Sequence, residues 1–173
     1  MAEQHVSNDK KQYLSFRVCT QNFAIPVNLV EVVVEMVHIS PLAKAPDFVA
    51  GMINFHGEII PVIDMSAAFN IARDSEIVHD KLIITATRNM QYALWVTDCS
   101  GLTEINSDEI KKAGKLMVDL DCVQGIFEME DASVLLYNPE AFFTADQLAL
   151  LKKALENRKQ TEHKTATKPN LQK

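Results

Sequence analysis

Short apolar runs, rich in β-branched and aromatic residues, alternate with polar turns along most of this chain. Residues 12–18 alternate Tyr, Leu, Phe and Val with polar residues, which predicts a strand with one buried face. After a turn, residues 23–25 are predicted to return as its hairpin partner. The run from Val32 to Ile39 is dominated by β-branched residues, so it predicts a further strand, entered through a short helical turn at residues 28–31.

The second half of the chain repeats this pattern. Residues 82–86 and 92–96 predict two strands around a polar turn, and residues 123–127 and 134–137 predict another hairpin. Residues 101–105 predict one more strand between the two pairs. Many short strands at nearly regular spacing are typical of small β-barrels rather than of a parallel sheet.

Residues 51–64 form the most informative stretch, because two apolar, β-prone runs meet there at the turn Asn54-Phe55-His56-Gly57. Glycine adopts the positive φ that a tight reversal needs, so the stretch predicts a β-hairpin with Gly57 in the turn. Pro61 has no N–H to donate to a neighbouring strand, which predicts an edge strand or a bulge at that residue.

Five acidic side chains lie around this hairpin, and they form either a plain solvated rim or a rim that selects a partner. An exposed Phe55 or Ile59 within the rim would favour the second interpretation, because an apolar patch bordered by charge is typical of a protein-binding site. The five are Glu31, Glu35, Asp47, Glu58 and Asp64.

The helix signal is strong only near the C-terminus, over residues 144–159. Thr144 and Gln147 form a capping-box pattern, and three leucines repeat on one helical face, namely Leu148, Leu151 and Leu155. That face predicts packing on a barrel, with binding to a partner as the alternative. The polar stretches 1–11 and 160–173 lack such a pattern, so we expect a flexible N-terminus and a disordered basic tail.

Composition and charge narrow the function. With 173 residues, 47% hydrophobic and 23% charged, the chain is typical of one globular unit, with a second lobe as an option. Residues 1–143 hold 10 Lys and Arg against 20 Asp and Glu, and so acidic a body is a poor match for nucleic acid. No run approaches the length of a membrane helix, and the start lacks the apolar core of a secretory signal, so we expect a cytoplasmic location.

Residues capable of chemistry are present but form no recognisable constellation. The five glycines are scattered, and none leads into a phosphate-binding loop. A metal site is conceivable only from His38, His56 and His79, which have no ligand spacing in sequence. The three cysteines are far apart and odd in number, which indicates small buried residues rather than a disulfide framework. We therefore expect no metal, no cofactor and no enzymatic activity.

A small β-barrel enzyme or ligand-binding protein is the alternative. It would need a deep polar pocket with converging titratable groups. Nothing in the sequence supports such a pocket.

Several stretches of the chain match a known pattern. They include Tyr13 to Phe16, Phe23 to Pro26 and Val30 to Val32, and above all the Gly-x-Ile-Asn-x-x-Gly-x-Ile-x-Pro-Val-Ile-Asp pattern of residues 51–64. In these features residues 12–143 resemble the CheW family of chemotaxis coupling proteins. The long pattern is far more specific than any single glycine motif.

The resemblance implies a mainly β fold, in which two small five-stranded SH3-like barrels pack together ahead of the C-terminal helix. The barrels would share residues 12–143, either consecutively or interleaved. It also implies a bacterial signal-transduction scaffold without enzymatic activity. Such an adaptor couples a methyl-accepting chemotaxis receptor to the regulatory domain of a CheA-type histidine kinase, and it reaches the membrane only through the receptor.

The resemblance also suggests which residues make the contacts. Receptor contact in the family uses the groove between the barrels, and the candidates here are Val30, Gly51, Asn54, Phe55, His56 and Gly57. Kinase contact uses an apolar face of a barrel, and the candidates here are Val32, Ile59 and Pro61.

His56 departs from the family pattern. The family usually has Leu-Arg where this chain has Phe55-His56. Arginine carries a permanent charge and a fork of donors, whereas histidine is smaller and mostly neutral near pH 7. The contact that the arginine makes is therefore in question, and the change suggests a specialised pathway. A scaffold that contacts only other barrels, and no receptor, is the second interpretation.

Overall fold

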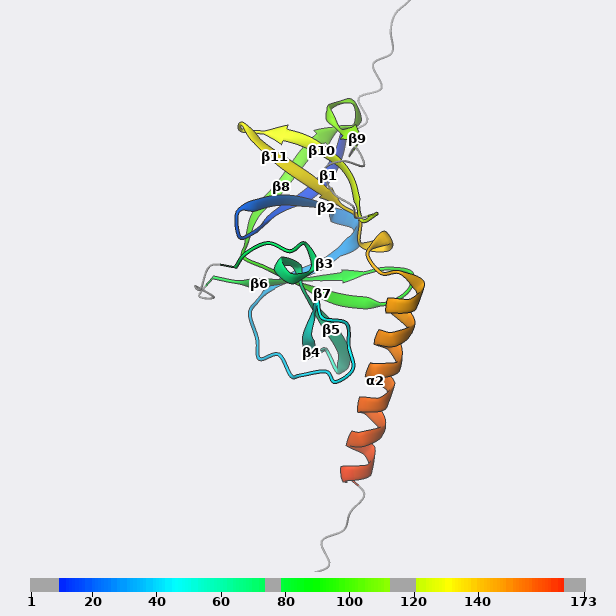
Figure 1. Cartoon of the computed structure of the whole chain (residues 1–173). Helices are drawn as coiled ribbons and strands as arrows, with labels where there is room; N and C mark the ends of the chain where they lie inside the picture. The colour runs from blue at the N-terminus through cyan, green and yellow to red at the C-terminus, as the bar shows by residue number, and fades with distance from the viewer. Residues whose placement is uncertain (1–9, 74–78, 113–120, 167–173) are drawn as a thin grey trace, which may run out of the picture.

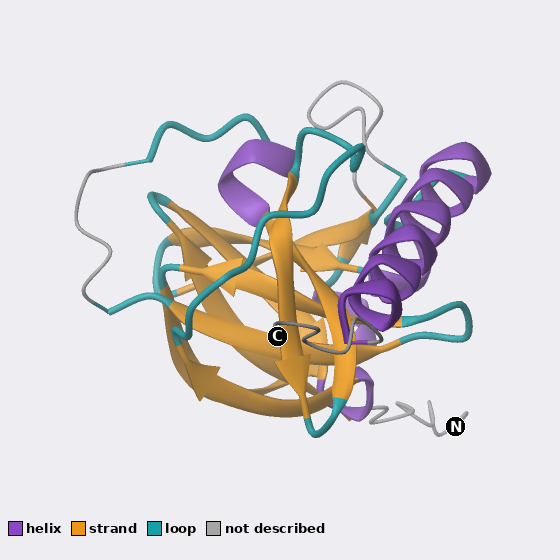
Figure 2. Ribbon diagram, turned by 90° about the horizontal axis from the view of Figure 1, so that it is seen from below, coloured by secondary structure: helices purple, strands orange, loops and turns teal. Residues whose placement is uncertain are grey.

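The computed structural model describes residues 10–73, 79–112 and 121–166, which form two β-sheets and one long helix (Figures 1 and 2). The first sheet, here the first barrel, contains β8 (Asp98–Asn106), β1 (Lys10–Val18), β2 (Gln21–Pro26), β11 (Ala132–Tyr137), β10 (Val123–Met129) and β9 (Lys111–Lys112), in that spatial order. The second sheet, here the second barrel, contains β3 (Val30–Glu35), β6 (Lys81–Ala86), β7 (Gln91–Val96), β5 (Glu58–Asp64) and β4 (Val49–Phe55), in that order. The helices are η1 (Val27–Leu29), α1 (Met65–Ala68), η2 (Ser107–Glu109), η3 (Pro139–Ala141) and α2 (Ala145–Ala166).

The predicted mainly β fold, with two packed subdomains and a C-terminal helix, is confirmed. The first barrel differs from the expected five strands by a sixth, the two-residue strand β9. Each sheet joins its antiparallel hairpins through one parallel pair, β2 with β11 and β5 with β7. The second barrel uses five consecutive strands, whereas the first combines the first two strands of the chain with the last four.

Alternate residues of a single strand are buried in different cores. On β7, Tyr92 and Leu94 face the core between the two sheets, whereas Ala93 faces the interior of the second barrel. On β6, Ile83 faces the core between the sheets, and Leu82 and Ile84 face the interior of the second barrel, so all three are buried. Side chains on a strand alternate between its two faces, so a strand covered on both sides has a continuous apolar sequence.

Two buried tyrosines connect the barrels through their hydroxyl groups. The hydroxyl oxygens of Tyr92 and Tyr137 lie 3.1 Å apart, and Tyr92 also donates to the carbonyl oxygen of Pro139 at 2.9 Å. Burial raises the pKa of both hydroxyls, so both stay protonated and act as neutral hydrogen-bonding groups. The contact between the barrels is thus an ordinary packed core with satisfied polar groups.

The third strand ends earlier than the sequence predicts. β3 stops at Glu35 rather than Ile39, and the following loop turns back to the outer edge of β4. There Ser40 exchanges two backbone hydrogen bonds with Met52, at 2.9 and 2.8 Å, and Ile39 packs into the interior of the second barrel. Ile39 therefore helps to close the barrel instead of lengthening β3, whereas Val37 is 47% exposed.

The prediction of an edge strand or bulge at Pro61 is wrong. β5 lies inside the sheet between β7 and β4, and the bulge of this hairpin falls on β4, between Val49 and Gly51. The parallel register with β7 begins at Val62, one residue after the proline. The missing N–H of Pro61 is tolerated because pairing with β7 starts only beyond it.

Both ends of the described chain are more ordered than expected. β1 begins at Lys10, inside the stretch predicted to be flexible, and α2 continues to Ala166, inside the predicted tail. No proline or glycine interrupts residues 145–166, and Gln, Lys and Glu are good helix formers, so nothing ends the helix at residue 159. Residues 1–9 and 167–173 of those predictions lie outside the described residues.

Candidate protein-binding site

The tip of the β4–β5 hairpin is a tight, exposed turn. Only His56 and Gly57 lie between the two strands, with φ values of +51° and +90°. Two central residues with positive φ are typical of a type I′ turn, whose twist matches that of the flanking strands. The side-chain Oδ1 of Asn54 accepts a hydrogen bond from the Gly57 N–H at 2.9 Å. The predicted hairpin and the positive φ of Gly57 are confirmed.

Phe55 attaches this tip to the barrel. It is half-buried and packs against the interior of the second barrel, whereas Asn54, His56 and Gly57 are exposed. The rings of Phe55 and His56 meet edge to face with centroids 4.3 Å apart. The turn therefore presents an imidazole and an amide on an aromatic support, a combination suited to contact with another protein.

Replacing Gly57 by valine is expected to lower the free energy of unfolding by about 1–3 kcal/mol, the range for a non-glycine residue held in a strained backbone region. A Cβ at Gly57 would meet no atom within 4 Å, so the cost is conformational and not steric. Urea unfolding followed by circular dichroism measures it. Gly57→Asn is the matched control, because asparagine tolerates positive φ. Equal losses for Val and Asn would contradict a left-handed position.

The structure brings four of the six receptor candidates together and separates the other two. Asn54 to Gly57 form the tip, but Gly51 is buried lower on β4. A Cβ at Gly51 would lie 2.3 Å from the carbonyl oxygen of Ser40, so no side chain fits there. Val30 lies on β3, at the opposite edge of the sheet order from β4, and packs against the core between the barrels. Gly51 thus allows the Ser40 backbone to approach β4 closely below the tip. Val30 lies in a different region, against the core between the barrels.

The three kinase candidates are also spread over the second barrel. Val32 is 38% exposed on β3, whereas Ile59 and Pro61 lie on β5, which β6 and β7 separate from β3 in the sheet order. Ile59 is half-buried and Pro61 is buried. Both line a groove of about 240 Å³ between β5 and α2, to which the helix contributes Lys152, Leu155, Glu156 and Lys159. Of the three candidates, only Val32 lies on open surface.

A cleft of about 830 Å³ lies between the two barrels. It is lined by Arg17, Cys19, Thr20, Asn22, Arg73, His79, Asp80, Lys81, Thr97 and Asp98. None of the six receptor candidates lines it. Its charges are largely paired, since Arg17 lies 3.8 Å from Asp98 and Lys81 lies 2.7 Å from Glu35.

At one end of this cleft lies an ion-pair network that sequence reasoning missed. The guanidinium of Arg73 contacts Asp80 at 2.7 Å and Asp64 at 3.0 Å, and it lies over the Trp95 ring with Cζ 4.1 Å from the centroid. The indole N–H of Trp95 donates to the same Asp80 oxygen at 2.6 Å. Asp80 is buried, so its charge depends on these partners. Arg73 and Asp80 have no pattern in sequence that indicates the pairing.

Asp64 has a second role that the sequence does indicate. It precedes α1, and its Oδ1 accepts hydrogen bonds from the backbone N–H groups of Ser66 and Ala67 at 2.9 and 3.3 Å. Aspartate at an N-cap position commonly makes these bonds. Asp64, the last residue of the pattern over residues 51–64, therefore caps α1 and also binds Arg73.

The three cysteines are free thiols, of which Cys122 is buried and Cys19 and Cys99 are half-buried. Burial raises the pKa of the Cys99 and Cys122 thiols to about 11, so both remain protonated and unreactive near neutral pH. Among the described residues, no three His, Cys, Asp or Glu side chains gather at a possible metal site. None of the described helices is long and apolar enough to cross a membrane.

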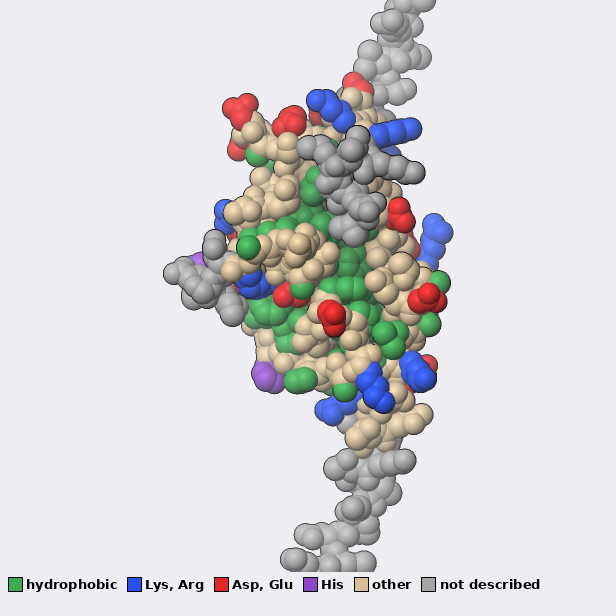
Figure 3. Space-filling model, viewed as in Figure 1, with side chains coloured by type: hydrophobic (Ala, Val, Ile, Leu, Met, Phe, Trp, Pro, Cys, Tyr) green, Lys and Arg blue, Asp and Glu red, His purple; other side chains and the backbone are tan. Residues whose placement is uncertain are grey.

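Figure 3 shows where side chains gather on one face of the molecule. Apolar side chains run through the middle of this face, at the level where the two barrels meet. Basic side chains gather at its lower end, around α2. This face thus combines exposed apolar surface with a charged border, as protein-binding surfaces often do.

The comparisons with known proteins agree on one family. The model of the CheW-like domain matches residues 12–147. The chain is 22% identical over 148 residues to the chemotaxis protein CheW of Rhizobium meliloti, covering 84% of this chain and 96% of the relative. It is 29% identical over 99 residues to the chemotaxis protein CheW of Thermotoga maritima, covering 57% of this chain and 65% of that relative.

A solved structure has the same fold. It is the crystal structure of the scaffolding protein TtCheW from Thermoanaerobacter tengcongensis, with a TM-score of 0.73 and 24% sequence identity. The alignment covers 79% of this chain and 94% of that one. At this identity the likeness supports the fold alone, whereas the family model extends over both barrels. The chain belongs to the family of CheW-like domains.

Proposed function

We propose that this protein is a chemotaxis adaptor that couples a methyl-accepting receptor to the regulatory domain of a CheA-type histidine kinase. Membership of the CheW-like family supports the scaffold role. The observation that carries the proposal is the β4–β5 tip, which is fixed by Asn54 and Gly57 and displays His56 to solvent. In this role the protein acts by binding and not by catalysis, in the cytoplasm, and reaches the membrane only through the receptor.

We assign receptor contact to Asn54, Phe55, His56 and Gly57 at the tip. Gly51 supports that contact by fixing the backbone behind it, and Val30 contributes from the region where the barrels meet. Kinase contact is assigned to the second barrel through Val32, Ile59 and Pro61. Asn54 and Ile59 are cross-strand partners, so the two proposed contacts adjoin on the β4–β5 hairpin, whereas Val32 lies apart from them on β3.

Replacing His56 by glutamate is expected to weaken receptor binding by about 1–3 kcal/mol, the usual cost of losing an important interface side chain. The new charge would stand in the proposed contact and leave the buried cores untouched. Isothermal titration calorimetry with a purified receptor cytoplasmic fragment measures it. Gln124→Glu, which adds the same charge at an exposed position of β10 in the first barrel, is the matched control. Unchanged affinity for both partners in folded His56→Glu would remove the tip from the site.

His56→Arg tests whether the partners have changed together with this chain. Arginine restores the charge and the donors that the family usually places there. Tighter binding to an ordinary chemotaxis receptor would indicate that the family contact is kept in weakened form. Weaker binding to the protein's own receptor would indicate partners adapted to histidine. A protein that binds the kinase domain but no receptor would instead be a scaffold that contacts other barrels only.

A further inference from the structure

The helix α2 borders the β4–β5 tip, although most of it lies outside the family match. The CheW-like model ends at residue 147, whereas the helix continues well beyond it. Figure 1 shows α2 running beside the second barrel and past the end of the barrel. Glu58, which follows Gly57 of the turn, lines the groove between β5 and α2 together with Glu156 and Lys159. The second half of α2 is therefore a neighbour of the tip.

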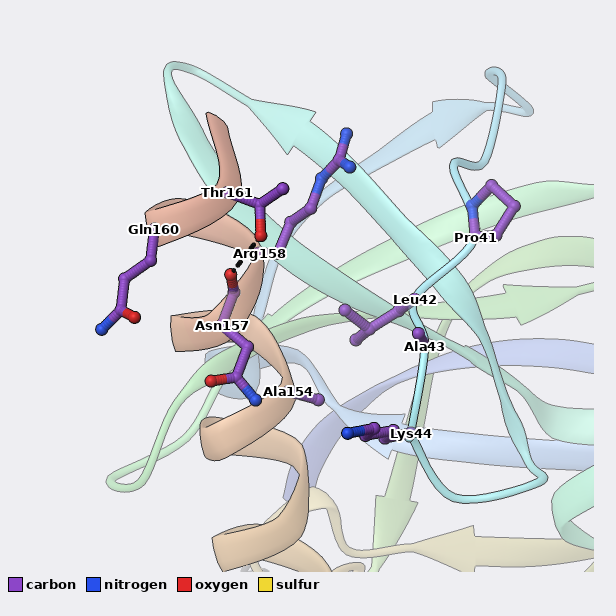
Figure 4. Close-up of a pocket in the computed structure, with 9 residues that line it drawn as sticks. All are labelled: Pro41, Leu42, Ala43, Lys44, Ala154, Asn157, Arg158, Gln160 and Thr161. Carbon is purple, nitrogen blue, oxygen red and sulfur yellow. Dashed lines mark hydrogen bonds between the residues drawn. The ribbon is translucent and has the colours of Figure 1, made fainter. Parts of the chain in front are cut away.

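A second groove, of about 530 Å³, lies between α2 and the loop of residues 41–44 (Figure 4). The helical residues that line the two grooves lie on opposite faces of α2, so the grooves flank the helix. The lining of the second groove is partly apolar. Leu42 extends from the loop toward the helix, and Ala154 of α2 is 5% exposed. This groove thus offers apolar surface at the side of the hairpin.

The polar lining of this second groove is cationic and amide in character. None of the described residues that line it is acidic. Lys44 extends from the loop toward the helix, and it makes no ion pair with a described carboxylate. Asn157 and Gln160 contribute side-chain amides from α2, and Arg158 also lines the groove. Ammonium and amide N–H groups are donors that suit carboxylate oxygens.

The loop that carries Lys44 is anchored at both ends. Ser40, just before it, exchanges two backbone hydrogen bonds with Met52, and the carbonyl oxygen of Pro46 accepts one from the Val49 N–H at 2.9 Å. Lys44 itself has a φ of +61°, a left-handed conformation that is uncommon for lysine. Residues held in sparsely populated backbone conformations cluster at binding sites. The loop therefore presents its lysine to the groove from a fixed base.

We propose that the groove between α2 and residues 41–44 receives an acidic segment of the receptor that contacts the β4–β5 tip. This proposal rests on the function proposed above. The groove adjoins the tip, because Ser40 is bonded to Met52, which lies two residues, about 7 Å of strand, from Asn54. A partner seated on the tip can therefore reach the groove without leaving the surface of the hairpin.

Charge favours an acidic occupant of this groove. Residues 1–143 hold 20 Asp and Glu against 10 Lys and Arg, so most of the body repels an acidic partner. The groove and the adjoining face of α2 attract one. Carboxylates of the segment would pair with Lys44 and the amides, while its apolar side chains would cover Leu42. Such complementarity fixes the orientation of a partner and excludes those of the wrong charge.

The test uses the full chain and a purified cytoplasmic fragment of the receptor from the same genome, with affinities measured by isothermal titration calorimetry. Lys44→Glu reverses a charge in the groove. Lys153→Glu makes the same change at an exposed position of α2 that lines neither groove, and it is the matched control. We expect Lys44→Glu to weaken receptor binding about tenfold and Lys153→Glu to change it by less than about twofold.

Gln160→Glu tests the groove from the helix side, independently of the loop conformation at Lys44. It adds a carboxylate to the lining and is expected to weaken receptor binding about threefold. Circular dichroism establishes that each variant is folded. Added salt should weaken binding by the unmodified chain more than binding by Lys44→Glu, because screening acts on an attraction that the variant has lost.

Equal receptor affinities of Lys44→Glu and Lys153→Glu would overturn the proposal, since the partner would then sense only overall charge or neither residue. Weaker binding of the kinase regulatory domain, with receptor binding unchanged, would assign the groove to another occupant and would overturn it too. Loss of receptor binding in His56→Glu but not in Lys44→Glu would refute the groove and leave the adaptor function standing. Absence of receptor binding by the unmodified chain would refute the adaptor function itself.

Discussion

Replacing Gly51 by valine is expected to lower the free energy of unfolding by about 4 kcal/mol, combining a strained backbone with a steric clash, each of order 1–3 kcal/mol. The φ of Gly51 is +151°, and its Cβ would lie 2.3 Å from the Ser40 carbonyl oxygen. That oxygen cannot move away freely, because it accepts the hydrogen bond from the Met52 N–H that closes the barrel. A loss of this size is a large part of a typical domain's total stability.

Thermal and urea unfolding followed by circular dichroism measure this loss. Gly57→Val in the same hairpin is the matched control, because it has positive φ but open space around the new Cβ. Gly51→Val should therefore cost more than Gly57→Val, and the difference reports the steric part. Equal stability of the two variants would show that the loop from Ser40 yields and that Gly51 is not structurally required.

Replacing Arg73 by methionine is expected to cost about 3 kcal/mol, because removal of one partner leaves a buried carboxylate without its counter-charge. Asp80 would keep the Trp95 N–H bond but lose the guanidinium 2.7 Å away. Asp64 would lose a partner as well, although it retains the N–H groups of α1. Urea unfolding at neutral pH measures the effect.

Arg17→Met provides the comparison for Arg73→Met. The Arg17 and Asp98 side chains are 51% and 45% exposed and lie 3.8 Å apart, so the pair should contribute no more than about 1 kcal/mol. Arg73→Lys should fall between the two, since lysine keeps the charge but not the fork of donors. A cost for Arg73→Met as small as that for Arg17→Met would mean that water replaces the guanidinium at little cost.

Most strands and the hairpin tip were predictable because their signals are local, whereas the two-residue strand β9 and the end of β3 at Glu35 were not. Alternation of apolar and polar residues, or a continuous β-branched run, indicates a strand. Gly57 indicates a tight turn because glycine readily adopts the positive φ that a two-residue turn needs. The spacing of Thr144 and Gln147, also a local signal, predicted the capping box that begins α2. There the Gln147 N–H donates to Thr144 Oγ1 at 3.2 Å.

Features that depend on strand order were not predictable in this way. Val32, Ile59 and Pro61 all lie on β-prone runs, but nothing in the runs reveals that two strands separate β3 from β5. Burial of Gly51 depends on a loop returning from β3. Arg73 and Asp80 meet because the fold brings a loop residue over Trp95, a contact without any sequence periodicity.

The strands of the first barrel come from both ends of the chain. This barrel can therefore complete its sheet only after the second barrel has been synthesised. β2 needs β11 as its parallel neighbour, but β11 leaves the ribosome more than a hundred residues later. At about 5–20 residues per second this interval lasts about 5–20 s. The second barrel emerges whole within the interval. During this interval the nascent β1–β2 hairpin lacks its neighbouring strands, although the second barrel has already emerged. Phe16 and Phe23 are then exposed to any chaperone that recognises aromatic surface.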